Sequence, residues 1–297
     1  MDTSLLILIL AILKFGSYLS TSWLVGYVFL TAGGGKLLLK SQPWPMRGMA
    51  TYFQIGMAIG VIAVLLTLPV HVIYVAGAGV EGLKDLFWWK LVWSGADAES
   101  LRLRALALGV LLVSQMLKIF KLPDLISNLL AIAGALTLVS SFGLRGHSVT
   151  LGMMGQGALI LHLLILTTWA GCLWPLYRVC DLLETANLKP LMSRFGVYAQ
   201  IPILLLAVTG GYLAVRLLHS WTTLFATPYG LLLSAKLVLV CAVLILAAKH
   251  RFWLVPCLGN EATPVAKLAR SIRWEMGLVG LIFLVTAFFT TTTGPGH

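Results

Sequence analysis

Four of the six histidines in this 297-residue chain form two pairs with almost the same spacing. Positions 71 and 219 differ by 148, and positions 147 and 297 differ by 150. Each of these histidines closes a long apolar segment, so the pairs predict a duplicated unit whose imidazoles gather at one level. Imidazole is the commonest metal ligand among side chains, and the spacing therefore predicts a metal site.

Softer donors and one deeper histidine extend this candidate set. Met153 and Met154 follow His147, and thioethers beside imidazoles favour Cu(I). His162 lies well inside an apolar segment, where an ionisable group costs on the order of 3 kcal/mol, so we expect it to face the interior and to have a partner. The candidate metal ligands are His71, His147, His162, His219, His297, Met153 and Met154.

Each candidate also has a plainer interpretation. A histidine at a helix C-terminus is favoured by the helix dipole without any ligand. A methionine pair at a helix start is commonly packing, and His297 can be simply the end of the chain. His250, in Lys249-His250-Arg251, is interpreted as part of an ordinary interfacial basic cluster.

The composition indicates which class of fold positions these residues. The chain is 59% hydrophobic and only 10% charged, too little polar surface for a water-soluble domain. We therefore expect an all-α integral membrane protein. The net charge of +11 is spread between apolar segments, which is typical of topology signals and does not predict a nucleic-acid partner.

Eight segments are long enough to cross a bilayer as helices of roughly 20 residues. The predicted spans are 4–31, 50–75, 101–120, 124–146, 154–178, 196–218, 229–253 and 272–293. A segment near 82–94 is too short to span, carries three tryptophans and is predicted to lie flat at the interface. Most Lys and Arg fall in the loops on one side, which predicts that both termini lie outside.

Short matches at similar offsets support the duplication. Thr21-Ser22-Trp23 corresponds to Thr167-Thr168-Trp169, and Tyr52-Phe53-Gln54-Ile55 corresponds to Tyr198-Ala199-Gln200-Ile201. The sequence thus predicts two parallel four-helix repeats, residues 1–147 and 148–297.

The second half resembles the copper resistance D (CopD) family of bacterial inner-membrane proteins. The resemblance rests on Gly146-His147-Ser148, His162, Trp169-Ala170-Gly171, the stretch Thr227-Pro228-Tyr229-Gly230 with Lys236, and a final helix that ends in a threonine run and Pro295. It implies passage of copper from periplasm to cytoplasm beside a periplasmic copper-binding partner, with His147 and His162 as copper-related positions. Cys172 departs from the family pattern, in which a glycine is common.

These observations favour a multi-pass protein of the bacterial inner membrane that moves copper through a His and Met site at the outer helix ends. They favour a transporter over an enzyme. A haem b electron-transfer protein, linked to quinone or copper, is the alternative, because paired histidines on neighbouring helices can hold haem. A scaffold without a metal would explain the topology and leave the histidines unexplained.

Overall fold

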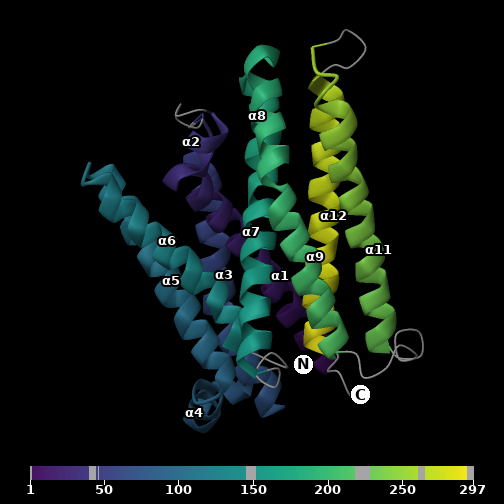
Figure 1. Cartoon of the computed structure of the whole chain (residues 1–297). Coiled ribbons are helices and arrows are strands. Elements are labelled where there is room, and N and C mark those ends of the chain that lie inside the picture. Colours follow the sequence, from purple (N-terminus) through teal and green to yellow (C-terminus); the bar gives the residue numbers. More distant parts are fainter. Residues whose placement is uncertain are drawn as a thin grey trace.

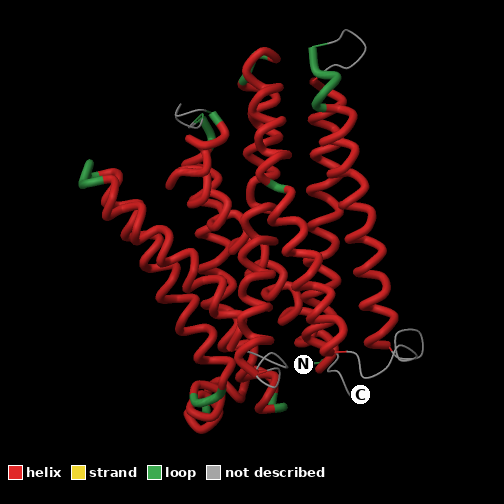
Figure 2. Tube along the Cα trace, viewed as in Figure 1, coloured by secondary structure: helices red, strands yellow, loops and turns green. Residues whose placement is uncertain are grey.

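The computed structural model describes residues 2–39, 45, 47–144, 152–217, 228–259 and 265–292. Within these ranges helices make up almost the whole trace and no strand is present (Figure 2). Among the described residues, eight helical stretches are long and apolar enough to cross a bilayer. This result confirms the all-α membrane fold and the eight spans that the sequence predicts.

Most of the helices stand side by side, and two neighbouring helices at the left of Figure 1 lean outward from the others. In chain order the helices are α1 (Thr3–Phe29), α2 (Gly35–Leu38), α3 (Met49–Ala76), α4 (Leu86–Trp93), α5 (Ala96–Ile119), α6 (Asp124–Ser140), α7 (Gly152–Leu182), α8 (Thr185–Tyr198), α9 (Gln200–Leu217), α11 (Pro228–Lys249) and α12 (Val265–Thr292). Wider π-helical turns follow α1 at Leu30–Gly34 and α11 at His250–Leu254.

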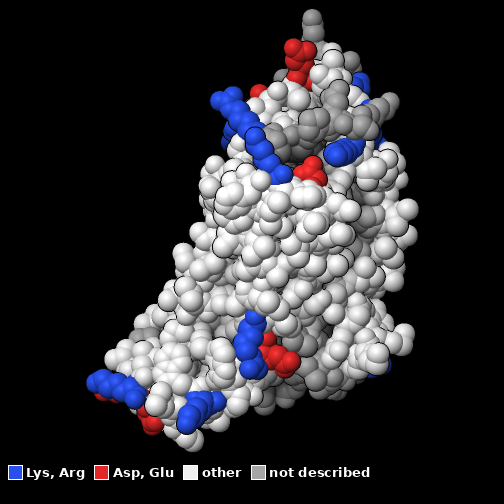
Figure 3. Space-filling view, turned by 90° about the vertical axis from the view of Figure 1, so that its left-hand side faces the viewer, with Lys and Arg blue, Asp and Glu red and all other residues white. Residues whose placement is uncertain are grey.

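The bundle has two distinct ends. At the α4 end, α1 begins, α12 ends and α4 lies against α3 and α5 (Figure 1). At the opposite end, the α8 end, α11 finishes and α12 begins. On the face in Figure 3, charged side chains gather toward these two ends and a broad band of other residues separates them. That distribution is expected of helices whose middles face hydrocarbon.

Helix α4 occupies the segment that the sequence predicts to be a separate short helix. The Asp85 side chain accepts a hydrogen bond from the Phe87 backbone N–H at 2.8 Å and so caps the helix start. Phe87 and Trp93 remain largely exposed, and the Arg102 guanidinium lies over the Trp93 ring. Exposed aromatic side chains at the end of a membrane bundle are typical of the headgroup level.

The two halves meet where α1 crosses α7. A methyl group on Gly26 would overlap the Gly171 backbone, and one on Gly171 would overlap the Ser22 carbonyl. Only hydrogen allows this approach, as at the small-residue crossings of other membrane helices. The Tyr52 hydroxyl donates to the Gly171 carbonyl at 2.7 Å, and its ring stacks on Trp174.

Packing partners correspond between the halves. Helix α1 packs on α3 as α7 packs on α9, and α5 packs on α6 as α11 packs on α12. Within the halves, α1 also contacts α6 as α7 contacts α12, and across the halves α1 contacts α7 and α12 while α7 contacts α6. The division into residues 1–147 and 148–297 as duplicated repeats stays a prediction.

Candidate metal site

His71 lies near the end of α3, where that helix meets α4 and the start of α5. Its Nδ1 atom is 3.5 Å from Oδ2 of Asp97, in the first turn of α5. Asp97 follows Gly95, whose extended backbone begins the helix, and a carboxylate in a first turn is stabilised by the helix dipole. An imidazole beside a carboxylate is a common arrangement at metal sites, where the acid orients the ring.

This pair lines a pocket that opens at the α4 end. Val75, Leu91, Val92 and Gly95 complete the lining, around a volume of about 340 Å³. The side chains of His71 and Asp97 are 21% and 40% exposed, so both can be reached from outside the bundle. The pocket therefore joins one nitrogen and one oxygen donor to an apolar wall.

Sequence reasoning missed Asp97. Acidic residues are scarce in this chain, ten in all, and Asp97 lies just before an apolar span that starts on the side where the span of His71 ends. The scarcity of acids and the position of Asp97 in the sequence could have predicted that it lies near His71, since adjacent antiparallel helices bring the end of one span and the start of the next to one level.

The two predicted methionines lie at the same end of the bundle. Met153 and Met154 begin α7 and are 89% and 82% exposed. They stand in the first turn of a helix that packs on α6, while His71 faces α4 and α5. The structure thus places them at the predicted level and does not bring them against His71. His147, His219 and His297 lie outside the described residues.

His162 has the interior partner that the sequence predicts. Its Nδ1 atom is 3.1 Å from the Thr209 hydroxyl, and Thr209 in turn donates to the Leu205 carbonyl at 2.7 Å. This contact fixes the orientation of the imidazole ring against α9. The Lys236 ammonium from α11 acts electrostatically on the same ring. This neighbour disfavours a cation at His162, by simple charge repulsion.

His250 is not the ordinary interfacial residue that the sequence suggests. Its Nδ1 atom is 3.0 Å from Oε2 of Glu275, and its Nε2 atom is 2.6 Å from the Ser271 hydroxyl. The side chains of His250 and Glu275 are only 14% and 3% exposed. The interpretation failed because the partners lie on α12, and a basic run in a sequence does not reveal a contact with another helix.

Within the described residues, no three His, Cys, Asp or Glu side chains come together closely enough to hold a metal ion. The site that the structure does assemble at the α4 end is the two-donor pocket of His71 and Asp97.

Comparison with known proteins gives one match. Residues 189–289 match a family model described as CopD, copper resistance protein D. The matched segment covers α8, α9, α11 and α12, so it includes His250 and Glu275 and leaves out His71 and His162. No curated protein and no solved structure matches the chain.

Proposed function

We propose that this chain, a copper resistance protein D family member through residues 189–289, moves copper across the membrane from the α4 end toward the α8 end. The family match and the eight apolar helices make it a copper resistance-related membrane protein. Movement of the metal, its direction and its ligands are the parts that we propose.

The pocket of His71 and Asp97 is the observation that carries this proposal. Copper would arrive there as substrate, with a neutral imidazole nitrogen and a carboxylate oxygen as its first ligands. Two protein donors leave room for others, and we propose His147, His219 and His297 for those positions. Met153 and Met154, which begin α7 at the same end and apart from His71, are proposed as a separate point of first contact for copper. Incomplete coordination suits an entry site, because metal bound by a closed four-ligand cage leaves slowly.

His162 is the proposed next position along the path. Thr209 holds its ring, and the nearby Lys236 ammonium would weaken the binding of a copper ion there. Weak binding is useful at a transit position, since an ion must leave each site on its path.

The proposed orientation of the chain in the membrane follows from the charge of its two ends. Lys189, Arg194, Lys249, Lys267 and Arg270 belong to the α8 end, and the side with more basic loops faces the cytoplasm. The α4 end would then face the periplasm of a bacterial cell, with the chain in the inner membrane. A periplasmic copper-binding protein is the proposed donor.

Copper stoichiometry of the purified chain tests this proposal. We expect His71, His147 and His219 changed together to Ala to lose bound copper, because the entry ligands are removed. The matched control Leu91→Ala alters the same pocket and keeps His71 and Asp97. Full copper content in the triple variant would refute a histidine site at the α4 end.

The haem alternative is not carried forward. The family match names copper, and the interior histidine, His162, is engaged by Thr209. A visible spectrum of the purified chain measures this directly, since haem would give a strong Soret band that shifts on reduction.

A further inference from the structure

Glu275 is an acidic residue buried inside an apolar helix, where a carboxylate is costly unless it has a partner. It lies three turns inside α12, is 2% exposed and is the one acidic residue in the buried class within the described part of the chain. Its neighbours along the helix, including Leu268 and Ile272, belong to the apolar core. Burial of an unpaired carboxylate costs several kcal/mol, on the order of 3 or more, so its partner must be considered with it.

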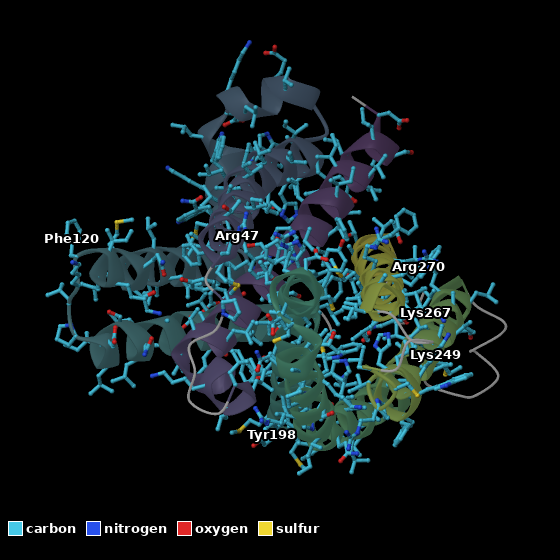
Figure 4. The ribbon with its side chains drawn as sticks, turned by 90° about the horizontal axis from the view of Figure 1, so that it is seen from above. Arg47, Phe120, Tyr198, Lys249, Lys267 and Arg270 are labelled. Atoms are coloured by element: carbon cyan, nitrogen blue, oxygen red, sulfur yellow. The ribbon has the colours of Figure 1, made fainter. Side chains whose placement is uncertain are left out.

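That partner is His250, and no other described cation makes an ion pair with Glu275. The charged groups of the surrounding elements are engaged elsewhere or lie apart. Arg251 donates to the Ser193 carbonyl, and Arg273 lies over the Tyr177 ring of α7. On α7, Arg178 pairs with Asp181. On α11 and α12, Lys249, Lys267 and Arg270 are further cations at this end (Figure 4).

The charge of the buried pair therefore depends on one proton. With that proton, on either the imidazole or the carboxyl, the pair has no net charge. Without it, a net negative charge remains between two helices in apolar surroundings, which is costly. Because the cost changes with protonation, the pair has the chemistry of a proton site.

Ser271 satisfies the imidazole in both states. When Nε2 is unprotonated, the serine hydroxyl can donate to it across 2.6 Å, and when Nε2 carries hydrogen the same oxygen can accept. A hydroxyl is both donor and acceptor, so no buried nitrogen loses its partner when the proton moves.

The His250 side chain keeps 14% of its surface exposed, so the pair is not fully enclosed by the helices. Trp253 and Trp274, next to the pair in the sequence, are 67% and 68% exposed, and tryptophans at this position are typical of the interface. The π-helical turn that begins at His250 widens the backbone here, as the Val255 N–H bonds the His250 carbonyl at 3.0 Å. Such turns interrupt helices frequently at functional sites.

The hydrogen-bonded set of Ser271, His250 and Glu275 has the same residue types as a hydrolase triad. The helix geometry disfavours a hydrolase active site here. Ser271 lies within the continuous helix α12, where backbone N–H groups bond carbonyls one turn earlier. Two free N–H donors, which an acyl-transfer site needs for its oxyanion, are not available from such a backbone.

We propose that His250 and Glu275 together form a proton-binding site that exchanges with the aqueous phase at the α8 end. The site lies at the opposite end from the proposed copper entry and does not depend on it. Its ligand is a proton, and its test needs no copper.

The test compares proton binding by the full chain with that of a double variant, His250→Leu with Glu275→Met. Replacing both members by apolar residues of similar volume removes the site without stranding a charge, so the chain should stay folded. We expect the variant to take up about one proton fewer per chain over the pH range in which both proteins stay folded. Infrared difference spectra over that range should also lose one titrating imidazole and carboxyl signal.

The single variant Glu275→Gln should alter the imidazole signal, and Glu99→Gln, an exposed acid on α5, should leave it as in the wild type. Equal proton uptake by the wild type and the double variant would overturn the proposal, because the pair would then be a permanently charged structural contact. In proteoliposomes of known orientation, the signal should respond first to acid added at the α8 end. A first response from the α4 end would overturn the proposed route.

Discussion

The two histidine and carboxylate pairs in the described part of the chain lie at opposite ends and differ in almost every physical respect. At the α4 end, His71 and Asp97 are 3.5 Å apart, partly exposed and part of a pocket wall. At the α8 end, His250 and Glu275 are 3.0 Å apart, buried, and joined by Ser271. The first arrangement can admit a ligand of the size of a metal ion. In the second, both ring nitrogens of His250 are already engaged by Glu275 and Ser271.

Residue type alone therefore does not predict the role of an imidazole in this protein. Both histidines lie near a helix end and both face an acid on the next helix in space. Exposure and the pocket beside His71 distinguish them, since a largely buried ring with both nitrogens bonded, as in His250, can exchange little besides a proton. Variants at the two pairs should therefore differ in stability and in copper affinity.

The largest effect is expected from removing the buried acid. Glu275→Ala should destabilise the chain by about 3–5 kcal/mol, because it leaves His250 without its partner in apolar surroundings. Thermal unfolding in detergent measures the loss. The matched change at the exposed pair, Asp97→Ala, should cost no more than about 1 kcal/mol. Equal losses at both ends would remove the distinction between a closed and an open pair.

A smaller effect is expected on copper binding at the open pair. Asp97→Ala should weaken copper affinity by roughly 10-fold to 100-fold or more, because it removes one of the two proposed protein ligands, and loss of an acid that only orients a metal-binding imidazole already costs that much. Equilibrium titration with a competing chelator measures it. Ser271→Ala, at the far end of the bundle, serves as the control and should leave the affinity unchanged. A loss in the control as large as that in Asp97→Ala would mean that both pairs affect the metal.

The smallest effect is expected from the hydroxyl that closes the buried pair. Ser271→Ala should destabilise the chain by about 1 kcal/mol, since His250 loses one hydrogen bond and keeps Glu275. Chemical unfolding of the two proteins in the same detergent measures this difference. Conservative replacement by Thr should restore most of the loss. If Ala and Thr behave alike, the 2.6 Å contact does not contribute to stability.

The spans and the short helix could be predicted from the sequence because bilayer thickness sets their length directly. Residues 50–75 were expected to span and α3 is Met49–Ala76, which shows how closely apolar length defines a helix. Predicted boundaries failed where helices project beyond hydrocarbon. The sixth span was expected to begin at 196, whereas α8 begins at Thr185 with polar residues in its first turns.

The candidate site was predictable only in part. His71 stood out by its spacing, and His162 by its depth. Asp97 and Glu275 were missed because a single acid has no periodic pattern, and its value depends on which helix faces it. The signal for Glu275 was its isolation within an apolar helix, where an ionisable residue is costly enough to imply a partner.

The crossing of α1 and α7 has a mechanical consequence. With hydrogen alone between the backbones at Gly26 and Gly171, and with Tyr52 bonded to the Gly171 carbonyl, neither helix can slide past the other at that point. A rotation of one half against the other would pivot there. In a rotation about that crossing, the two halves would move apart at one end of the bundle and together at the other. Opening between the halves at the α4 end would then accompany closing at the α8 end.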